Sequence, residues 1–236
     1  MQDILAKLKI ETKITYIILG TNVLIWAAME ISGGSTNTAV LVEYGALNRY
    51  LVLGGEVWRI VSSAFLHIGI FHLLINSYTL YQLGNFVEDF FGRTKLIATY
   101  VITAITAGLL SLVLSSPFSV SAGASGALFG LVGLILGNAW AKKTYVFDLP
   151  IDERQLLPFV AYNLVFGFIA PGIDNWAHIG GLVGGILLGF VFDPALSFDP
   201  SPIKKILPKI LGVASILILA LTAVFWFLSI WGINVL

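Results

Sequence analysis

One serine stands out in this sequence because of the small residues around it. Ser125 follows Gly123 and Ala124 and precedes Gly126, at the start of a long apolar stretch. Glycines on both sides let the backbone turn tightly and let another group approach closely. By itself, a serine that enters an apolar helix more often bonds to the helix backbone or caps its N-terminus. The hypothesis that Ser125 is a nucleophile therefore depends on what the chain could place beside it.

The three histidines of the chain, His67, His72 and His178, all lie in apolar stretches. A serine hydroxyl is a poor nucleophile until a base takes its proton, and His178 is the candidate base. Acyl transfer also needs donors for the developing oxyanion. His72 and Asn76, which share a helix face at i and i+4, could donate, together with the backbone N–H of Ser125. These residue types predict an acyl-transfer site.

A third member of this candidate site is not obvious. Asp174 precedes His178 by four residues and could orient its imidazole, but it is better interpreted as the N-cap of a helix, so we predict a Ser–His dyad. His67 could support His72 or could simply lie at the membrane interface. A metal site built from the three histidines is not favoured, because no acidic residue shares their level in the membrane. We therefore predict no metal.

Composition places the chain in a membrane. Of 236 residues, 58% are apolar and only 11% are charged, with a mean hydropathy of +0.93. A soluble domain carries about a quarter charged residues. The net charge is zero and no basic block occurs, which argues against nucleic acid as a partner. The absence of cysteine excludes disulfides and thiolate chemistry.

Seven apolar runs are long enough, or nearly so, to cross about 30 Å of hydrocarbon. The expected fold is an all-α, polytopic membrane helix bundle. The first run is interpreted as a retained span, because it is long for a signal peptide and lacks a good cleavage site. The connection 30–59 mixes aromatic and charged residues and is expected at the membrane interface. The expected spans are 14–29, 60–87, 96–114, 122–141, 156–170, 176–192 and 210–233.

The basic residues predict the orientation of the chain. With seven spans, eleven lysines and arginines fall on one side and two, Arg49 and Arg59, on the other. This asymmetry predicts a cytoplasmic N-terminus and an external C-terminus. At about 1.5 Å per helical residue, Ser125, His178 and His72 lie roughly 25, 22 and 24 Å above the cytoplasmic boundary. Polar groups at one level inside a bundle indicate a functional site.

Two strips of glycine predict which helices pack together. Small residues at intervals of about four let membrane helices approach at short backbone distance. If the two strips face each other, Ser125 and His178 meet at the outer end of the contact, and valine at Gly130 or Gly181 should separate the two helices. The strips are Gly126, Gly130, Gly133 and Gly137 in the fourth run, and Gly180, Gly181, Gly184, Gly185 and Gly189 in the sixth.

The fifth run carries four aromatic rings, Phe159, Tyr162, Phe166 and Phe168. Packing in the core is the slightly favoured interpretation of these rings. Alternatively, they separate the site from lipid and part to admit a substrate helix.

Taken together, these motifs resemble the rhomboid family of intramembrane serine proteases. Gly123-Ala124-Ser125-Gly126 matches the family's GxSG, residues 72–76 match its HxxxN, and residues 177–181 match its AHxxG. Trp58 and Arg59 match its WR, and Glu88 with Gly92 matches the end of its second span. Each motif is weak alone, but together, in order and on the expected spans, they are specific. The resemblance covers about residues 44–192.

The resemblance implies a six-helix core followed by a seventh helix. We expect a short cytoplasmic segment (1–13), a catalytic core (14–192), and a loop with the seventh span (193–236). Ser125 would be the nucleophile, His178 the base, and His72, Asn76 and the Ser125 backbone the oxyanion hole. Phe129 stands where the family often has tyrosine packed under the base. The expected supporting residues are Gly123, Gly126, Gly181, Phe129, Glu88 and Arg59.

The resemblance also implies the substrates. These would be single-span, membrane-anchored proteins, cut in or near the membrane, and no cofactor is implied. The expected location is a multi-pass position in a prokaryotic inner membrane, with the active site opening to the outside. One alternative is a catalytically inactive relative that binds membrane clients. Another, less favoured, is a small transporter, which should carry more ionisable groups at midplane.

Overall fold

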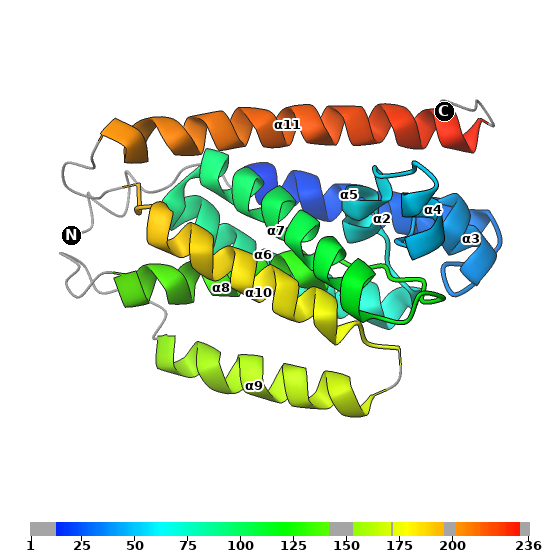
Figure 1. The fold of residues 1–236 in the computed structure, drawn as a ribbon, viewed down its shortest axis with the longest axis horizontal. Coiled ribbons are helices and arrows are strands. Elements are labelled where there is room, and N and C mark those ends of the chain that lie inside the picture. Colours follow the sequence, from blue (N-terminus) through cyan, green and yellow to red (C-terminus); the bar gives the residue numbers. More distant parts are fainter. Residues whose placement is uncertain (1–12, 142–152, 171, 196–201, 232–236) are drawn as a thin grey trace.

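The fold is drawn in Figure 1 from a computed structural model, which describes residues 13–141, 153–170, 172–195 and 202–231. Helices make up the regular structure of this part of the chain, with one isolated antiparallel bridge between Leu47 and Ser121. The helices are α2 (Lys13–Ile31), α3 (Thr38–Glu43), α4 (Arg49–Leu53), α5 (Arg59–Ser62), the 3-10 helix η1 (Ser63–Phe65), α6 (Gly69–Phe91), α7 (Arg93–Leu114), α8 (Ser125–Ala141), α9 (Glu153–Ile169), α10 (Asn175–Val191) and α11 (Pro202–Ile230).

Seven of these helices correspond to the expected spans. By length and composition, α2, α7 and α11 are each able to cross a membrane, and α6 does so as part of a bent pair with residues 59–65. The apolar helices α8, α9 and α10 are shorter, with at most 17 residues each. The expected all-α, polytopic bundle with a seventh C-terminal helix is confirmed.

The second expected span, 60–87, was placed wrongly. The chain bends by 92° between residues 59–65 and α6. Leu66 is extended (φ −90°, ψ 150°), and α6 begins only at Gly69, whose φ is +74°. That left-handed conformation favours glycine, and the Gly69 amide donates to Ser35 Oγ at 3.1 Å. The polar side chains of α6 therefore start in its first turn, not in the middle of a longer helix.

The seventh span is longer than expected and starts at Pro202, not at residue 210. Proline suits the first position of a helix, because its missing N–H has no partner there in any case and its φ is already helical. The first two turns of α11 therefore carry Lys204, Lys205 and Lys209 on the helix itself. The sequence pattern had placed these lysines in a loop.

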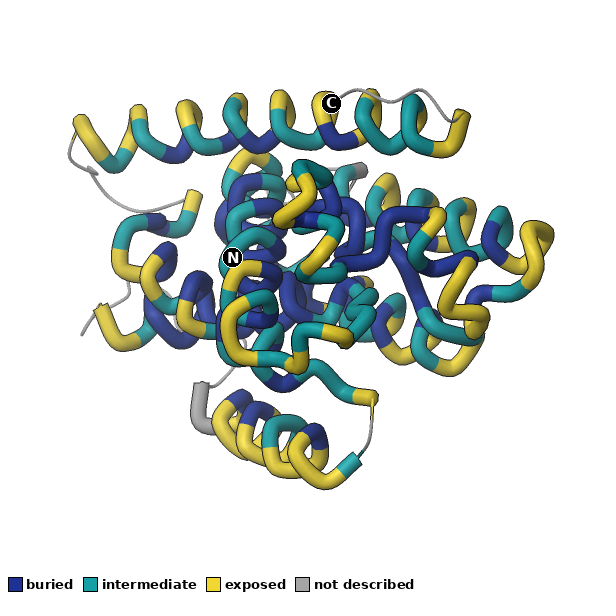
Figure 2. The backbone as a smooth tube through the Cα atoms, turned by 45° about the vertical axis from the view of Figure 1, so that its right-hand side comes forward, coloured by how far each residue is buried: buried dark blue, intermediate teal, exposed yellow. Residues whose placement is uncertain are grey.

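The core of the bundle is α8. All residues from Gly126 to Asn138 are buried, as expected for a helix that is apolar on every side. The tube in Figure 2 shows this buried centre, with exposed faces on the outer helices. The main neighbours of α8 are α10, which runs parallel to it, and α7, which runs antiparallel.

The two glycine strips do face each other, as predicted. A Cβ atom at Gly181 would lie 1.9 Å from the carbonyl oxygen of Gly126, and one at Gly185 would lie 2.0 Å from that of Gly130. The prediction for Gly130 itself was wrong in direction. A Cβ atom there would lie 2.1 Å from Oγ1 of Thr103, on α7. Valine at Gly130 would thus separate α8 from α7, because the carbonyl of Gly130, and not its hydrogen, faces α10.

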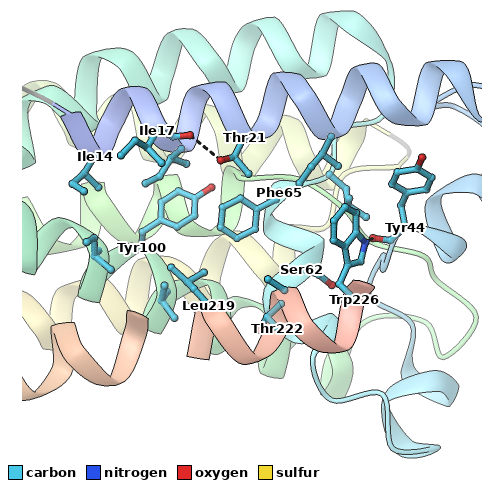
Figure 3. A pocket seen from close by; sticks show the side chains of 16 residues that line it. Ile14, Ile17, Thr21, Tyr44, Ser62, Phe65, Tyr100, Leu219, Thr222 and Trp226 are labelled. Carbon is cyan, nitrogen blue, oxygen red and sulfur yellow. Dashed lines mark hydrogen bonds between the residues drawn. The ribbon is translucent and has the colours of Figure 1, made fainter. Parts of the chain in front are cut away.

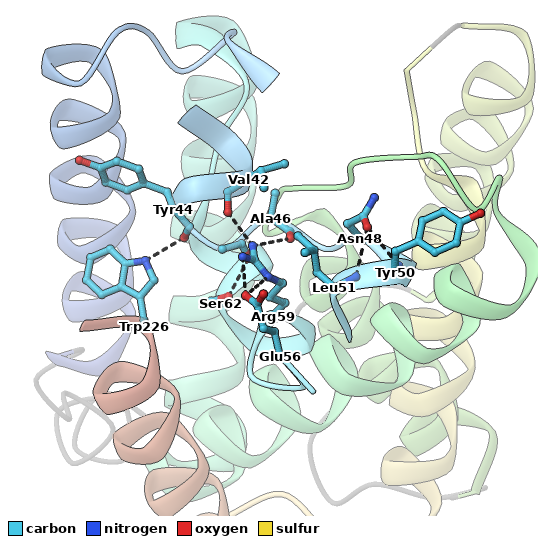
Figure 4. Close-up of polar contacts among 11 residues, drawn as sticks. Val42, Tyr44, Ala46, Asn48, Tyr50, Leu51, Glu56, Arg59, Ser62 and Trp226 are labelled. Carbon is cyan, nitrogen blue, oxygen red and sulfur yellow. Dashed lines mark hydrogen bonds and ion pairs between the residues drawn. The ribbon is translucent and has the colours of Figure 1, made fainter. Parts of the chain in front are cut away.

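The connection between α2 and α6 is held by buried polar contacts around Arg59 (Figure 4). Its guanidinium donates to Glu56 at 2.8 Å and to the carbonyl of Val42 at 2.6 Å, and it lies 4.7 Å from the centroid of the Trp58 ring. The carbonyl of Ala46 accepts a further bond. Arg59 therefore organises this segment and does not contact Ser125.

Glu88 fixes the start of α2 from a neighbouring helix. Its fully buried carboxylate accepts from the backbone N–H groups of Ile14 and Thr15, at 3.2 and 2.9 Å, and from the Thr15 hydroxyl at 2.8 Å. A carboxylate is favoured there because the first N–H groups of a helix have no partner within it. Glu88 is thus a structural anchor at the opposite end of α6 from His72.

Two helices flank the bundle on opposite sides, α11 and α9 (Figure 1). An apolar cavity of about 330 Å³ lies between α2, α7 and α11, with Ile17, Tyr100 and Leu219 among its lining residues (Figure 3). Trp226 lies at one end of this cavity, and its indole N–H donates to the carbonyl of Tyr44. None of the four polar side chains of the candidate site lines this cavity.

Candidate active site

The segment before Ser125 is extended and held by backbone bonds. Leu47 and Ser121 exchange two N–H to carbonyl bonds, at 2.8 and 2.9 Å, and Gly123 donates to the carbonyl of Ser63 at 2.9 Å. Gly123 has a φ of +144°, in the region that favours glycine. The helix α8 then begins at Ser125. The Ser125 side chain therefore lies at the sharp change from extended chain to helix.

The central contact of the site joins Ser125 to His178. Oγ of Ser125 lies 2.9 Å from Nε2 of His178, although 53 residues separate them in the chain. His178 lies in the first turn of α10 and is 9% exposed. The parallel packing of α8 and α10 brings the two first turns together. With Nε2 accepting from the hydroxyl, this is the geometry of a serine and its base.

The aromatic ring of Phe129 covers one face of the His178 imidazole. Phe129 lies one turn after Ser125 and stacks on His178, with centroids 4.4 Å apart and planes 13° apart. Nδ1 of His178 is buried, and among the described residues it has no hydrogen-bond partner. Packing against Phe129, and not a hydrogen bond from a third residue, therefore orients this imidazole.

Asp174 caps α10, as predicted. Its carboxylate accepts from the backbone N–H of Ala177 at 3.1 Å. Its oxygens also accept from the hydroxyls of Ser111 and Ser115, at the end of α7. Sequence reasoning missed these two serines. Their i, i+4 spacing, which places both on one helix face, was the only available signal.

His72 lies in the first turn of α6, with its Nε2 beside Gly123. Its Nδ1 accepts from the backbone N–H of Ile68 at 3.3 Å, so that in the neutral ring Nε2 carries the proton. A Cβ atom added to Gly123 would lie 2.9 Å from this Nε2 and 3.7 Å from Oγ of Ser125. The missing side chain of Gly123 thus leaves a space that is bordered by both Nε2 of His72 and Oγ of Ser125.

Asn76 lies one turn further along α6 and is buried. Its Nδ2 is enclosed and has no hydrogen-bond partner within the described part of the chain. A buried amide without a partner costs free energy, about 1–3 kcal/mol. The missing partner of Asn76 Nδ2 would be explained if this N–H group donates to a bound substrate.

His67 is fully buried beside His72, with ring centroids 5.3 Å apart. This contact is the one expected if His67 supports His72; its depth relative to the membrane interface stays a prediction. Within the residues that the structure describes, no cluster of three or more histidine, cysteine or acidic side chains could hold a metal ion.

The structure thus brings together, on three helices, the residues that the sequence singled out. His72 on α6, Ser125 on α8 and His178 on α10 each lie in the first turn of their helix. Gly126 and Gly181 form the close contact beside them, whereas Arg59 and Glu88 act at a distance through the fold.

The helix α9 packs only sparsely against α8 and α10, the helices that carry Ser125 and His178. Its four aromatic side chains are largely exposed, which contradicts the core-packing interpretation. The ring of Phe159 lies 6.4 Å from that of Phe129. Asn175 links α9 to α10, because its side-chain amide donates to the carbonyl of Leu164 at 2.8 Å. Gly167 leaves room for this side chain, since a Cβ atom there would lie 2.2 Å from Oδ1 of Asn175.

Comparison with known proteins places the chain in a family. A family model described as the rhomboid domain matches residues 54–194, which is more than half of the chain. The chain therefore belongs to the rhomboid family, and it is a multi-pass integral membrane protein.

Individual relatives agree with this assignment. The chain is 40% identical over 171 residues to rhomboid protease GluP of Bacillus subtilis (strain 168), which covers 72% of this chain and 33% of that protein. It is 40% identical over 152 residues to RHOMBOID-like protein 5 of Arabidopsis thaliana, covering 64% and 49%. It is 32% identical over 164 residues to Rhomboid-like protease 2 of Toxoplasma gondii, covering 68% and 56%. The matched part of the chain thus covers between 33% and 56% of the length of these relatives.

Proposed function

We propose that this protein is a serine endopeptidase that cleaves membrane-anchored proteins in or near a transmembrane segment. The observation that carries the proposal is the 2.9 Å contact between Oγ of Ser125 and Nε2 of His178. The partially buried hydroxyl has a base in reach, and that base is held by a stacked ring. Among the alternatives, an inactive relative has no need for this pair.

In the proposed reaction, Oγ of Ser125 attacks the scissile carbonyl while Nε2 of His178 accepts its proton. The negative charge on the tetrahedral intermediate is stabilised by the N–H groups of His72, Asn76 and the Ser125 backbone. When the C–N bond breaks, His178 gives its proton to the leaving amine. Water, deprotonated by the same imidazole, then attacks the acyl-enzyme and releases the second product and the serine.

The proposed substrates are single-span membrane proteins, because the Ser125–His178 pair lies inside a bundle of apolar helices. Purified protein incubated with a panel of such substrates should produce cleavage products whose termini mass spectrometry can map. A serine-directed fluorophosphonate should label Ser125. Client binding without labelling or cleavage would favour the inactive relative.

We further propose that the protein lies in a prokaryotic inner membrane, with the N-terminus in the cytoplasm and both the C-terminus and the active-site opening outside. The eleven-to-two distribution of basic residues supports this orientation. Reporter fusions at both ends test this orientation. A reporter that works only in the cytoplasm should be active at the N-terminus and inactive at the C-terminus. A reporter that works only outside the cytoplasm should show the opposite pattern. A cytoplasmic C-terminus would contradict the proposal.

A further inference from the structure

Three polar side chains join the end of α7 to the start of α10. The carboxylate of Asp174 accepts from the hydroxyl of Ser115 at 3.0 Å through Oδ1, and from the hydroxyl of Ser111 through Oδ2. Ser111 is 2% exposed, and Ser115 is the C-cap of α7. Asp174 is the N-cap of α10. This serine–aspartate cluster, made of Ser111, Ser115 and Asp174, therefore ties the first turn of α10 to another helix.

Close packing of α10 on α7 brings the cluster together. Gly184 and Gly180 of α10 both lie against Thr106 of α7, where added Cβ atoms would lie 2.3 Å from its Oγ1 and 2.5 Å from its carbonyl oxygen, respectively. Leu110, one turn further along α7, also borders Gly180, at 2.9 Å. The two helices therefore run antiparallel, so that the end of α7 reaches Asp174, the residue that precedes α10.

The carboxylate of Asp174 holds the backbone of α10 and not the imidazole of His178. It accepts from the N–H of Ala177 at 3.1 Å in addition to the two hydroxyls. Among the described residues, Nδ1 of His178 has no hydrogen-bond partner. The first four N–H groups of a helix have no partner within it, so a cap that is itself bonded to α7 fixes this turn. His178 lies in the turn, four residues after Asp174.

Ser115 is itself fixed by a third segment. Nη2 of Arg49, at the start of α4, donates to the carbonyl oxygen of Ser115 at 2.7 Å. Cationic side chains bind the unpaired carbonyls at the end of a helix in this way. Two residues earlier, Leu47 exchanges two backbone bonds with Ser121, which lies four residues before Ser125. The segment 47–49 is therefore bonded both to the chain that leads to the serine and to the residue that holds the cap of α10.

We propose that Ser111 and Ser115 are positioning residues for the base His178 and act through Asp174; this inference rests on the proposed protease function. The ring stacked on the imidazole sets its orientation, whereas the serine–aspartate cluster sets where the first turn of α10 lies. The cluster thereby controls the 2.9 Å distance between Nε2 of His178 and Oγ of Ser125. Without the two hydroxyls, the carboxylate still caps α10 but loses its bonds to α7. A displacement of about 1 Å can cost roughly a hundredfold in rate.

The first test is the double substitution Ser111→Ala with Ser115→Ala in the full chain, assayed with a single-span substrate. We expect kcat to fall about tenfold and KM to stay within about twofold, because the base moves while the surfaces that bind substrate do not. Labelling of Ser125 by a fluorophosphonate should slow by the same factor. The matched control is Ser116→Ala, an exposed serine outside the cluster, which should behave like the natural sequence. A lower melting temperature with unchanged turnover in the folded fraction would overturn the proposal.

Substitutions of Asp174 separate the position of α10 from the charge of the carboxylate. Asparagine caps helices as well as aspartate does, and its amide can still bond to both hydroxyls. Asp174→Asn should therefore retain most of the natural rate. Asp174→Ala removes the cap and the cluster together and should lower kcat by about ten- to a hundredfold. An equal loss in both variants would contradict the proposal, because it would show that the negative charge, and not the place of α10, supports the base.

Backbone hydrogen exchange provides a measurement that does not depend on activity. The double serine variant should exchange the amides in the first turn of α10 about tenfold faster than the natural sequence does, because local opening of that turn becomes easier. The first turn of α8 should exchange at the same rate in both proteins. Equal exchange in α10 would overturn the proposal whatever the kinetics show. A natural sequence that is neither labelled nor able to cleave would instead contradict the proposed protease function, so the two failures are distinct.

Discussion

The ring of Phe129 stacks on the imidazole of His178 at 4.4 Å between centroids. Phe129 and Ser125 lie one turn apart on α8, so a single helix presents both the hydroxyl and the surface on which the imidazole rests. Since Nδ1 of His178 has no partner among the described residues, this stacking is what holds Nε2 toward Ser125.

Replacing the ring of Phe129 should therefore reduce catalysis more than stability. In Phe129→Leu the imidazole loses its flat support, and a displacement of about 1 Å can cost roughly a hundredfold in rate. We expect a decrease in kcat of about ten- to a hundredfold, with KM little changed. Phe129→Tyr, which keeps the ring, is the matched control and should stay near the natural rate. Equal activity in both variants would contradict the orienting role.

The polar residues should divide into two classes when each is replaced by alanine. Ser125→Ala and His178→Ala should abolish both labelling and cleavage, because no other hydroxyl shares the base. His72→Ala and Asn76→Ala should each lower the single-turnover rate by about 10²–10³ and leave measurable activity, since oxyanion donors act mainly in the transition state.

The contrary outcomes of these four substitutions are distinct. If His72 and Asn76 only link helices, their loss should lower the melting temperature by an amount that reflects about 0.6 kcal/mol per bond and leave turnover in the folded fraction unchanged. Full activity in His178→Ala would rule out the dyad.

The contact between α8 and α10 can be tested with the smallest possible side chain. In Gly181→Ala the new methyl group would lie 1.9 Å from the Gly126 carbonyl oxygen, so the two helices must separate. Cleavage should fall by about a hundredfold through displacement of His178, with a lower melting temperature. The control is Gly20→Ala on α2, where no atom lies within 4 Å of the added carbon, and it should keep full activity.

The exposed aromatic rings of α9 lead to a prediction about substrate admission. Trimming Phe159 to alanine should raise the cleavage rate of membrane substrates severalfold, because its ring lies 6.4 Å from that of Phe129 and its loss leaves less apolar contact between α9 and α8. Labelling by a small fluorophosphonate should not change, since that probe needs little space. Val165→Ala, also exposed on α9, is the control and should change neither rate. Lower activity and lower stability together in Phe159→Ala would favour a packing role.

Much of the site was predictable because its residues are marked by local features. Ser125 is set among small residues, Asp174 precedes an apolar run as helix caps do, and the glycine strips have the spacing of close helix contacts. Each signal depends only on residues that are near one another in the chain.

The predictions made from the sequence failed where the position of a residue depends on contacts between segments that are distant in the chain. The start of α6 at Gly69 depends on a bond to Ser35 on another segment. The direction in which Gly130 faces depends on the rotation of α8 about its axis, which its packing against α7 and α10 fixes. The role of Ser111 and Ser115 depends on where α7 ends relative to α10.

The sequence by itself therefore determined the membrane class, the family resemblance and the identity of the polar residues, because composition and helical period are properties of the chain alone. Only the tertiary structure decided that the first turns of α6, α8 and α10 lie together and that Phe129 covers His178. The rotation and crossing of packed helices set these distances, since they arise from close packing among many side chains at once.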